Sequence, residues 1–140
     1  MLTWLVIGVG DITTRRVLPA ILAEERSQLT GIVTRDPAKA APYGVPAFTT
    51  LDAALKESEA AAIYVASPVF LHAPQSIAAL AAHRHVLCEK PLAMNLAEAE
   101  RMVAQACESR RTLGVAYYRR AYPKIHRARE LIRRDRKSVV

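Results

Sequence analysis

A carboxylate, an ammonium and a proline ring follow one another directly at Glu89, Lys90 and Pro91. They come straight after HVLC (85–88), an apolar run that has the composition of a buried strand. Proline ends the strand and directs the lysine into a cleft, where its charge can stabilise an alcohol oxygen that is losing its proton. The carboxylate can pair with the ammonium or hold a ribose hydroxyl. The alternative is a strand-end lysine that reaches solvent, with Glu89 as its surface partner.

A second candidate site follows the first apolar run, which ends in the spacing Gly8-x-Gly10-x-x-Thr13. Gly8 permits a tight turn, and Gly10 lets the backbone approach a pyrophosphate. The helix expected next would offer free N–H groups and a positive dipole to the phosphates. Thr13 replaces the usual third glycine and is small enough for helix–strand packing at slightly wider spacing. An ordinary tight strand-to-helix turn is the alternative interpretation.

The second apolar run ends in Thr34 and Arg35, where a dinucleotide-binding sheet meets the adenosine ribose. An acid at this place favours NAD, whereas a guanidinium suits the 2′-phosphate of NADP and can stack on adenine. Asp36 precedes Pro37 and is expected to cap the following helix. We therefore predict NADP rather than NAD as the cofactor. A solvated surface arginine is the alternative interpretation of Arg35.

Strands and helices alternate along the chain. Apolar runs predict six strands, within 3–10, 29–35, 46–50, 61–68, 85–90 and 112–119. Helical spacing falls between and after them, within 13–25, 36–44, 51–58, 72–84, 95–110 and 123–134. This order predicts the α/β class, a doubly wound parallel sheet covered on both faces. Ligands of such sheets bind at the carboxyl ends of the strands, so the three polar clusters should meet there.

Length and composition indicate one soluble domain. The chain has 140 residues, 51% of them hydrophobic and 24% charged. Apolar runs fall short of the roughly 20 residues that a membrane helix needs, and the first residues lack the features of a signal peptide. We therefore expect a cytoplasmic protein without a membrane partner. Cys88 and Cys107 have no metal-binding or redox spacing, so two reduced thiols and no metal site are expected.

The net charge of +7 is unevenly distributed. Residues 1–109 contain 9 Lys and Arg against 11 Asp and Glu, whereas residues 110–140 contain 11 against 2. A basic segment can bind polyanions. It has neither an aromatic stacking platform nor a recognition motif beside it, so we expect no nucleic-acid partner.

Several segments resemble, in order, the N-terminal half of the Gfo/Idh/MocA oxidoreductases, the glucose–fructose oxidoreductase and inositol dehydrogenase family. They are GVGDITTRRVLPAI, IVTRDPAKA, AAIYVASPVFLHAPQSIAALAAHRHVLCEKPLAMNLAEAERMV and GVAYYRRAYP, and the resemblance covers nearly all of residues 1–132. It implies a Rossmann domain over 1–120 and a helix over 121–134 that leads to a second, open-sheet domain. It also implies hydride transfer between a nicotinamide and a sugar, cyclitol or related carbinol.

The resemblance also implies roles for single residues. Gly8, Gly10, Asp11 and Ile12 would line the diphosphate, and Thr34 and Arg35 the ribose end. After the fourth strand, the dinucleotide would be bordered by Ser67, Pro68 and His72, although His72 also fits a capping or packing role. Glu89 and Lys90 would lie beside the nicotinamide ribose and the reacting carbon, with Lys90 as the catalytic residue. Arg120 would lie near the cofactor or the domain junction.

The end of the chain departs from the family pattern. Family members continue through a glycine-containing turn into the second domain, whereas this chain reads RRDRKSVV. The family's general base, usually a histidine on that domain, has no counterpart here, and neither has most of the substrate pocket. We expect this fragment to bind cofactor without turning over, and a homo-oligomer only with the missing domain. Residues 135–140 are expected to be a non-native tail, because a string resembling a short-read sequencing adapter can encode them.

Two other function classes stay open at this stage. A stand-alone NAD(P)-binding module with a sensing or regulatory role would need no second domain, but it would not explain Lys90. An unrelated Rossmann-type domain, such as a methyltransferase, would bind S-adenosylmethionine instead of NADP. The Thr34–Arg35 pair and the CEKP stretch argue against that third class.

Overall fold

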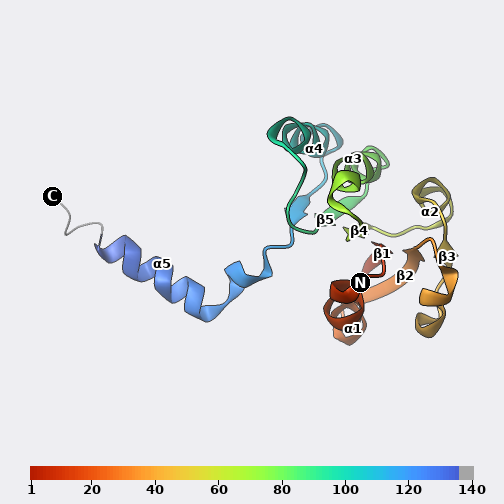
Figure 1. Cartoon of the computed structure of the whole chain (residues 1–140), viewed down its shortest axis with the longest axis horizontal. Coiled ribbons are helices and arrows are strands. Elements are labelled where there is room, and N and C mark those ends of the chain that lie inside the picture. The colour runs from red at the N-terminus through yellow and green to blue at the C-terminus, as the bar shows by residue number, and fades with distance from the viewer. Residues whose placement is uncertain (136–140) are drawn as a thin grey trace.

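Six parallel strands form one sheet in the order β3-β2-β1-β4-β5-β6. The structure is a computed structural model, and it describes residues 1–135. Every neighbouring pair of strands is parallel (Figure 1). The strands are β1 (Leu2–Ile7), β2 (Ser27–Val33), β3 (Ala47–Phe48), β4 (Ala62–Val65), β5 (His85–Cys88) and β6 (Leu113–Val115). The predicted α/β class with a doubly wound parallel sheet is confirmed.

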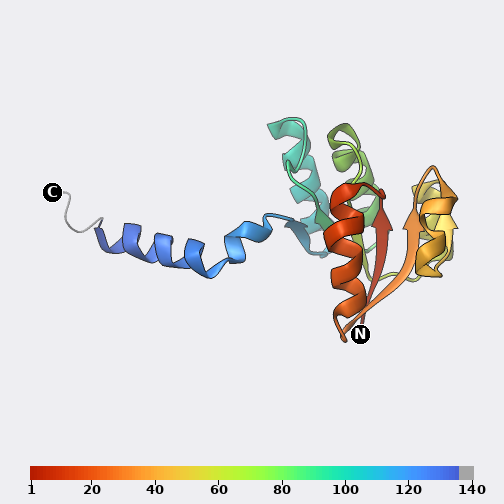
Figure 2. The same cartoon turned by 60° about the horizontal axis from the view of Figure 1, so that its bottom comes forward.

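Helices cover both faces of this sheet. On one face lies α1 (Leu18–Ala23), and the other face carries α2 (Leu51–Glu57), α3 (His72–Ala81) and α4 (Leu96–Ser109) (Figures 1 and 2). Right-handed crossovers explain this division. The chain moves in one direction across the sheet from β1 to β2, and in the opposite direction from β4 to β5 and β6, so the helices of these connections pass over opposite faces. Five short turns join these elements: η1 (Thr13–Val17), η2 (Pro37–Lys39), η3 (Ala41–Tyr43), η4 (Val69–Leu71) and η5 (Tyr118–Ala121).

Two hydrophobic clusters, one on each face, hold the layers together. Alternation along β4 separates them, since Ile63 and Val65 belong to the cluster beneath α2–α4 while Tyr64 belongs to the cluster beneath α1. Leu18 from α1 and Leu80 from α3 are fully buried in their respective clusters. Each such side chain contributes about 1.5–3 kcal/mol by leaving water.

Local sequence signals explain several element boundaries. Asn95 caps α4, because its side-chain oxygen accepts a hydrogen bond from the Glu98 backbone N–H at 3.0 Å. The carboxylate of Glu98 accepts from the backbone N–H of Met94, one residue before the cap, instead of from the cap itself. The π-helical turn η1 leads directly into α1. Pro19 explains this turn, because a proline lacks the N–H that an α-helix needs there.

Two sequence expectations differ in detail from the structure. The short helix expected over 36–44 is a pair of 3₁₀ turns that ends at Gly44, whose φ of 63° is left-handed. Prolines at 37 and 42 favour such short turns over a continuous helix. The third strand is two residues long, because Pro46 precedes it and α2 begins at Leu51.

The last helix, α5 (Pro123–Asp135), extends away from the sheet and its helices (Figures 1 and 2). Ile125, Leu131 and Ile132 are exposed along it. An isolated helix of this length is marginally stable in water. Within residues 1–135, every helix is too short or too polar to cross a membrane. The tail expected over 135–140 lies outside the described residues, apart from Asp135 at the end of α5.

Candidate cofactor site

Four strand ends meet at one edge of the sheet. Gly8 follows β1, Thr34 follows β2, Ala66 follows β4 and Glu89 follows β5. β1 and β4 are neighbours although β2 and β3 separate them in sequence, so the direction of the crossovers reverses between them. Sheets of this kind bind ligands outside the carboxyl ends of their strands at this point. The sequence prediction that the polar clusters meet is therefore confirmed.

One cavity at this edge is the glycine cleft. It has a volume of about 740 Å³. Ten of its lining residues are Gly8, Gly10, Thr34, Arg35, Asp36, Lys39, Ala66, Ser67, Pro68 and Gln75. It thus brings together most of the residues predicted for the diphosphate and ribose. Lys39 and Gln75 are additions that the sequence analysis missed.

The two glycines of the cleft have different reasons to be glycine. Gly8 has a φ of 91°, and a Cβ there would lie 2.6 Å from the carbonyl oxygen of Ala66. Its absence lets the turn after β1 pass against the end of β4. A Cβ on Gly10 would meet no atom within 4 Å among those described. The backbone at Gly10 is therefore bare toward open space, which fits the close approach of a diphosphate.

The end of the cleft at β2 is polar and cationic. Asp36 caps η2 by accepting a 3.1 Å hydrogen bond from the Ala38 backbone N–H, as predicted. The hydroxyl oxygen of Thr34 accepts from the Asp36 N–H at 3.2 Å and so orders this turn. Arg35 and Lys39 are exposed on either side of the cap and line the same cleft. Two positive charges that share one cleft with a glycine turn suit a phosphate monoester.

The second cavity, called here the lysine cavity, has a volume of about 290 Å³. Its lining residues come from five separate stretches of chain: Ile12, Ala66, Ser67, Pro68, Val69, His72, Glu89, Lys90 and Tyr118. It contains the predicted Lys90, which is exposed, and Glu89, which is 7% exposed. Tyr118 is again a residue that the sequence analysis missed.

His72 ties together two loops of the lysine cavity. Its ring is 1% exposed, with Nδ1 2.8 Å from the carbonyl oxygen of Pro91 and Nε2 2.9 Å from that of Ser67. Carbonyl oxygens only accept, so both bonds form together only when both ring nitrogens carry hydrogen. Ser67 is held further by its hydroxyl, which lies 2.6 Å from Oε1 of Gln75. His72 thus borders the cavity mainly through the loops that it positions.

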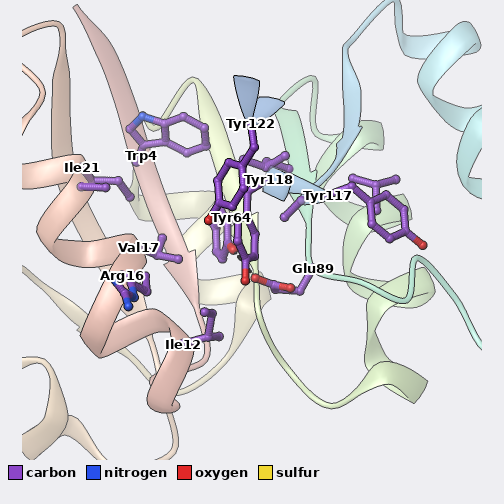
Figure 3. A pocket seen from close by; sticks show the side chains of 14 residues that line it. Trp4, Ile12, Arg16, Val17, Ile21, Tyr64, Glu89, Tyr117, Tyr118 and Tyr122 are labelled. Carbon is purple, nitrogen blue, oxygen red and sulfur yellow. Dashed lines mark hydrogen bonds between the residues drawn. The ribbon is translucent and has the colours of Figure 1, made fainter. Parts of the chain in front are cut away.

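Glu89 is held by hydrogen bonds and not by its neighbouring ammonium. Its Oε1 accepts from the Tyr64 hydroxyl at 2.6 Å; Figure 3 shows the two side chains. Its Oε2 accepts from the backbone N–H of Lys90 at 3.1 Å. Burial first, and then the bond to Glu89, raise the pKa of Tyr64 above its ordinary value, so the phenol stays a donor. The ammonium of Lys90 takes part in none of the ion pairs found within residues 1–135.

Three predicted residues lie at the margin of these cavities or beyond it. Ile12 is 39% exposed and lines the lysine cavity but not the glycine cleft. Asp11 lies at the start of the first helix and forms an exposed 3.8 Å ion pair with Arg15. Arg120 is exposed on η5, and its backbone N–H donates to the carbonyl of Tyr117. Neither Asp11 nor Arg120 is among the residues that line the two cavities.

These features define a dinucleotide-binding domain of the Rossmann type. They are a parallel sheet with a glycine turn at its switch point, two cations after β2 and a lysine after β5. The sequence profile of an oxidoreductase family, described as an NAD-binding Rossmann fold, matches residues 2–117. The chain belongs to this family, the Gfo/Idh/MocA oxidoreductases. The family resemblance noted from the sequence is thereby confirmed.

Relatives and solved structures agree with this assignment. A dTDP-3,4-didehydro-2,6-dideoxy-α-D-glucose 3-reductase of Streptomyces violaceoruber is 38% identical over 74% of this chain and 31% of its own length. KijD10, a 3-ketoreductase from Actinomadura kijaniata solved with TDP-benzene and NADP, matches with a TM-score of 0.87 and 33% identity, over 95% of this chain and 43% of that one. The WlbA dehydrogenase of Bordetella pertussis, solved with NADH and UDP-GlcNAcA, gives a TM-score of 0.89 and 28% identity, over 96% and 42%.

This chain spans about a third of the length of the curated relatives it matches. The family and its solved members support a nicotinamide cofactor for the chain. The named relatives are reductases and dehydrogenases.

Proposed function

We propose that this chain is the NADP-binding domain of an enzyme that transfers a hydride between a nicotinamide and a sugar, cyclitol or related carbinol. The observation that carries the proposal is the continuity of the two cavities. Ala66, Ser67 and Pro68 line both of them, so one path runs from Arg35 to Lys90. A dinucleotide lying along this path would place its 2′-phosphate at one end and its reactive ring at the other.

Each part of the path has a role in this proposal. Arg35 and Lys39 bind the 2′-phosphate, and the bare backbone at Gly10 approaches the diphosphate. Glu89 accepts hydrogen bonds from ribose hydroxyls. The cofactor, when bound, supplies the carbon that accepts or donates the hydride. The ammonium of Lys90 hydrogen-bonds the substrate oxygen and stabilises the negative charge that develops on it.

The preference for NADP rests on this chain's own residues. Solved relatives differ in this respect, since KijD10 was solved with NADP and WlbA with NADH. An acid that accepts from both hydroxyls of the adenosine ribose would favour NAD at the end of β2. This chain has Thr34 and Arg35 there, and its nearby carboxylate, Asp36, is already bonded to the Ala38 N–H. Arg35 and Lys39 outnumber Asp36 among the charged residues that line the cleft.

We also propose that residues 1–120 form the cofactor domain and that residues 121–134 lead into a domain that supplies the general base and most of the substrate pocket. The position of α5 supports this, because the helix extends away from the sheet (Figure 2) and its apolar residues Ile125, Leu131 and Ile132 are exposed. In this arrangement, association into homo-oligomers would depend on the second domain. The chain by itself would bind cofactor without turning over.

Calorimetric titration of NADPH and NADH into the chain and its Arg35→Ala variant tests the cofactor proposal. We expect NADPH to bind the unaltered chain about tenfold or more tightly than NADH, because a charge-assisted phosphate contact contributes about 1.5–3 kcal/mol. Arg35→Ala should remove most of this difference by weakening NADPH alone. Arg26→Ala is a matched control, since Arg26 is exposed beside Glu24 at the opposite end of β2. An unchanged NADPH-to-NADH affinity ratio in Arg35→Ala would overturn the preference.

A further inference from the structure

Tyr64 is a buried phenol on the strand β4 that the proposed roles leave unassigned. It is 5% exposed and lies at the base of an aromatic groove, whose residues include Trp4, Tyr118 and Tyr122 (Figure 3). A buried tyrosine needs a partner for its hydroxyl, because an unpaired one costs about 1–3 kcal/mol. Its partner is the carboxylate of Glu89, at 2.6 Å.

Sheet register explains why these two side chains meet. Tyr64 pairs with Val6 on one side and with Leu87 on the other. Glu89 lies two residues after Leu87, so it projects from the same face of the sheet. Its own N–H donates to the Val65 carbonyl at 2.9 Å, which continues the ladder past the end of β5. The tyrosine side chain is long enough to reach from its place opposite Leu87 to Glu89, two residues further along, at the edge where the cavities lie.

The hydrogen bonds of Glu89 leave a defined set of acceptor sites free. Oε1 is bonded to the Tyr64 hydroxyl and Oε2 to the Lys90 N–H. A carboxylate has about four lone-pair sites, so about two remain for a ligand. Glu89 is 7% exposed and lines both the lysine cavity and the aromatic groove, so the direction of its free sites depends on how the carboxylate is held.

We propose that Tyr64 is a positioning residue that fixes the Glu89 carboxylate for hydrogen bonding to the diol of the nicotinamide ribose. The inference rests on the proposed function of this site and extends it to a residue that touches neither cofactor nor substrate. Tyr64 acts through Glu89 alone. Its loss should therefore weaken the nicotinamide half of the cofactor and spare the adenosine half.

Calorimetry on the unaltered chain and on Tyr64→Phe tests this claim with two ligands. NADPH carries the nicotinamide ribose, whereas 2′,5′-ADP has the same adenosine and 2′-phosphate without it. We expect Tyr64→Phe to weaken NADPH about tenfold, as for loss of a hydrogen bond to a charged group, and to leave 2′,5′-ADP within about twofold. Equal losses for both ligands, or no loss for NADPH, would overturn the proposal. Tyr43→Phe is a control that removes a partly buried hydroxyl from another part of the chain.

A double-mutant cycle shows whether Tyr64 acts through Glu89. In the Glu89→Ala background, Tyr64→Phe should cause no further loss of NADPH affinity, because the group that it positions is already absent. Additive losses would mean that the phenol acts independently of the carboxylate, and they would overturn the assignment.

Amide hydrogen exchange at Lys90 in the cofactor-free chain decides the positioning role without any ligand. If the Tyr64 hydroxyl holds the carboxylate, Tyr64→Phe should loosen the bond between Lys90 N–H and Oε2 and speed exchange about tenfold. Tyr43→Phe should leave this rate unchanged. An unaltered rate in Tyr64→Phe would contradict the proposal. Failure of the unaltered chain to bind NADPH would instead contradict the proposed function, and the exchange rate would still decide the role of Tyr64.

Discussion

The two ends of the cofactor path hold their charges in opposite ways. At the β2 end, Arg35 and Lys39 are exposed and lie beside a capped turn. At the β5 end, the carboxylate of Glu89 is buried and bears two hydrogen bonds. Exposed charges are screened by salt and tolerate small displacements, whereas buried hydrogen-bonded charges depend on geometry. The contrast suggests that the choice between NADP and NAD depends on charge at the β2 end. At the β5 end, binding depends on the fixed position of the Glu89 carboxylate.

The largest expected effect concerns the glycine turn that joins the two ends. Gly8→Ala places a methyl group 2.6 Å from the Ala66 carbonyl oxygen at a φ of 91°, so we expect the free energy of unfolding to fall by about 3 kcal/mol or more. Urea unfolding measures this loss. Gly10→Ala meets no atom within 4 Å and should change stability by less than about 1 kcal/mol. It should nevertheless weaken NADPH, because the methyl group occupies the path. Similar stability losses in both variants would contradict the different roles of the two glycines.

The next effect tests the rigidity of the β5 end. His72→Leu removes both ring contacts, to the carbonyls of Ser67 and Pro91. We expect the free energy of unfolding to fall by about 2–3 kcal/mol and NADPH to bind more weakly. His72→Asn keeps a donor near the position of Nδ1 and should lose about half as much. If both variants were as stable as the parent chain, His72 would not hold the two loops.

A smaller effect concerns Lys39, at the opposite end. Lys39→Ala should weaken NADPH about threefold in low salt, because an exposed charge contributes about 0.5–1 kcal/mol. The difference should disappear as salt rises from about 0.05 M to about 0.5 M. The loss in Tyr64→Phe should persist over the same range, since its bond is buried. Salt series of both variants by calorimetry make the comparison, and equal salt dependence would remove the distinction between the two ends.

The smallest test uses the two free thiols as probes of the β5 end. Cys88 immediately precedes Glu89, and burial first, with the nearby charge of Glu89, raises the pKa of its thiol to about 11. Below that pH the thiol stays neutral, so at pH 8 about one in a thousand is thiolate. Iodoacetamide should therefore modify the exposed Cys107 and leave Cys88 intact until the pH approaches 11 or the chain unfolds. Peptide mass spectrometry measures both sites, and rapid labelling of Cys88 at pH 8 would show that this strand end opens.

Sequence patterns predicted the fold class and most of the path, because parallel strands bring their carboxyl ends together whatever their exact register. Gly8, Gly10, Thr34 and Arg35 therefore fall in one cleft, and Glu89 and Lys90 in the cavity that continues it. The contacts that depend on register were not predictable. Four residues at the cavities or in contact with Glu89 were not predicted from the sequence: Lys39, Tyr64, Gln75 and Tyr118.

Two of the missed residues, Tyr64 and Lys39, have a physical reason in the local structure. Tyr64 meets Glu89 through the pairing of β4 with β5, and the sequence signal was a lone phenol inside an apolar strand. Lys39 reaches the cleft because residues 37–39 form a 3₁₀ turn, which periodicity does not distinguish from a short helix. Asp11 and Arg120 were carried over from the family, and the roles predicted for them at the cofactor and domain junction stay predictions.

Nuclear magnetic resonance of the labelled chain during NADPH titration tests the central claim most directly. The claim is that one dinucleotide occupies the whole path from Arg35 to Lys90. It predicts that the amide signals of Gly8, Gly10, Arg35, Glu89 and Lys90 shift together, with one common affinity. Shifts confined to one end of the path, or centred on the aromatic groove, would contradict it.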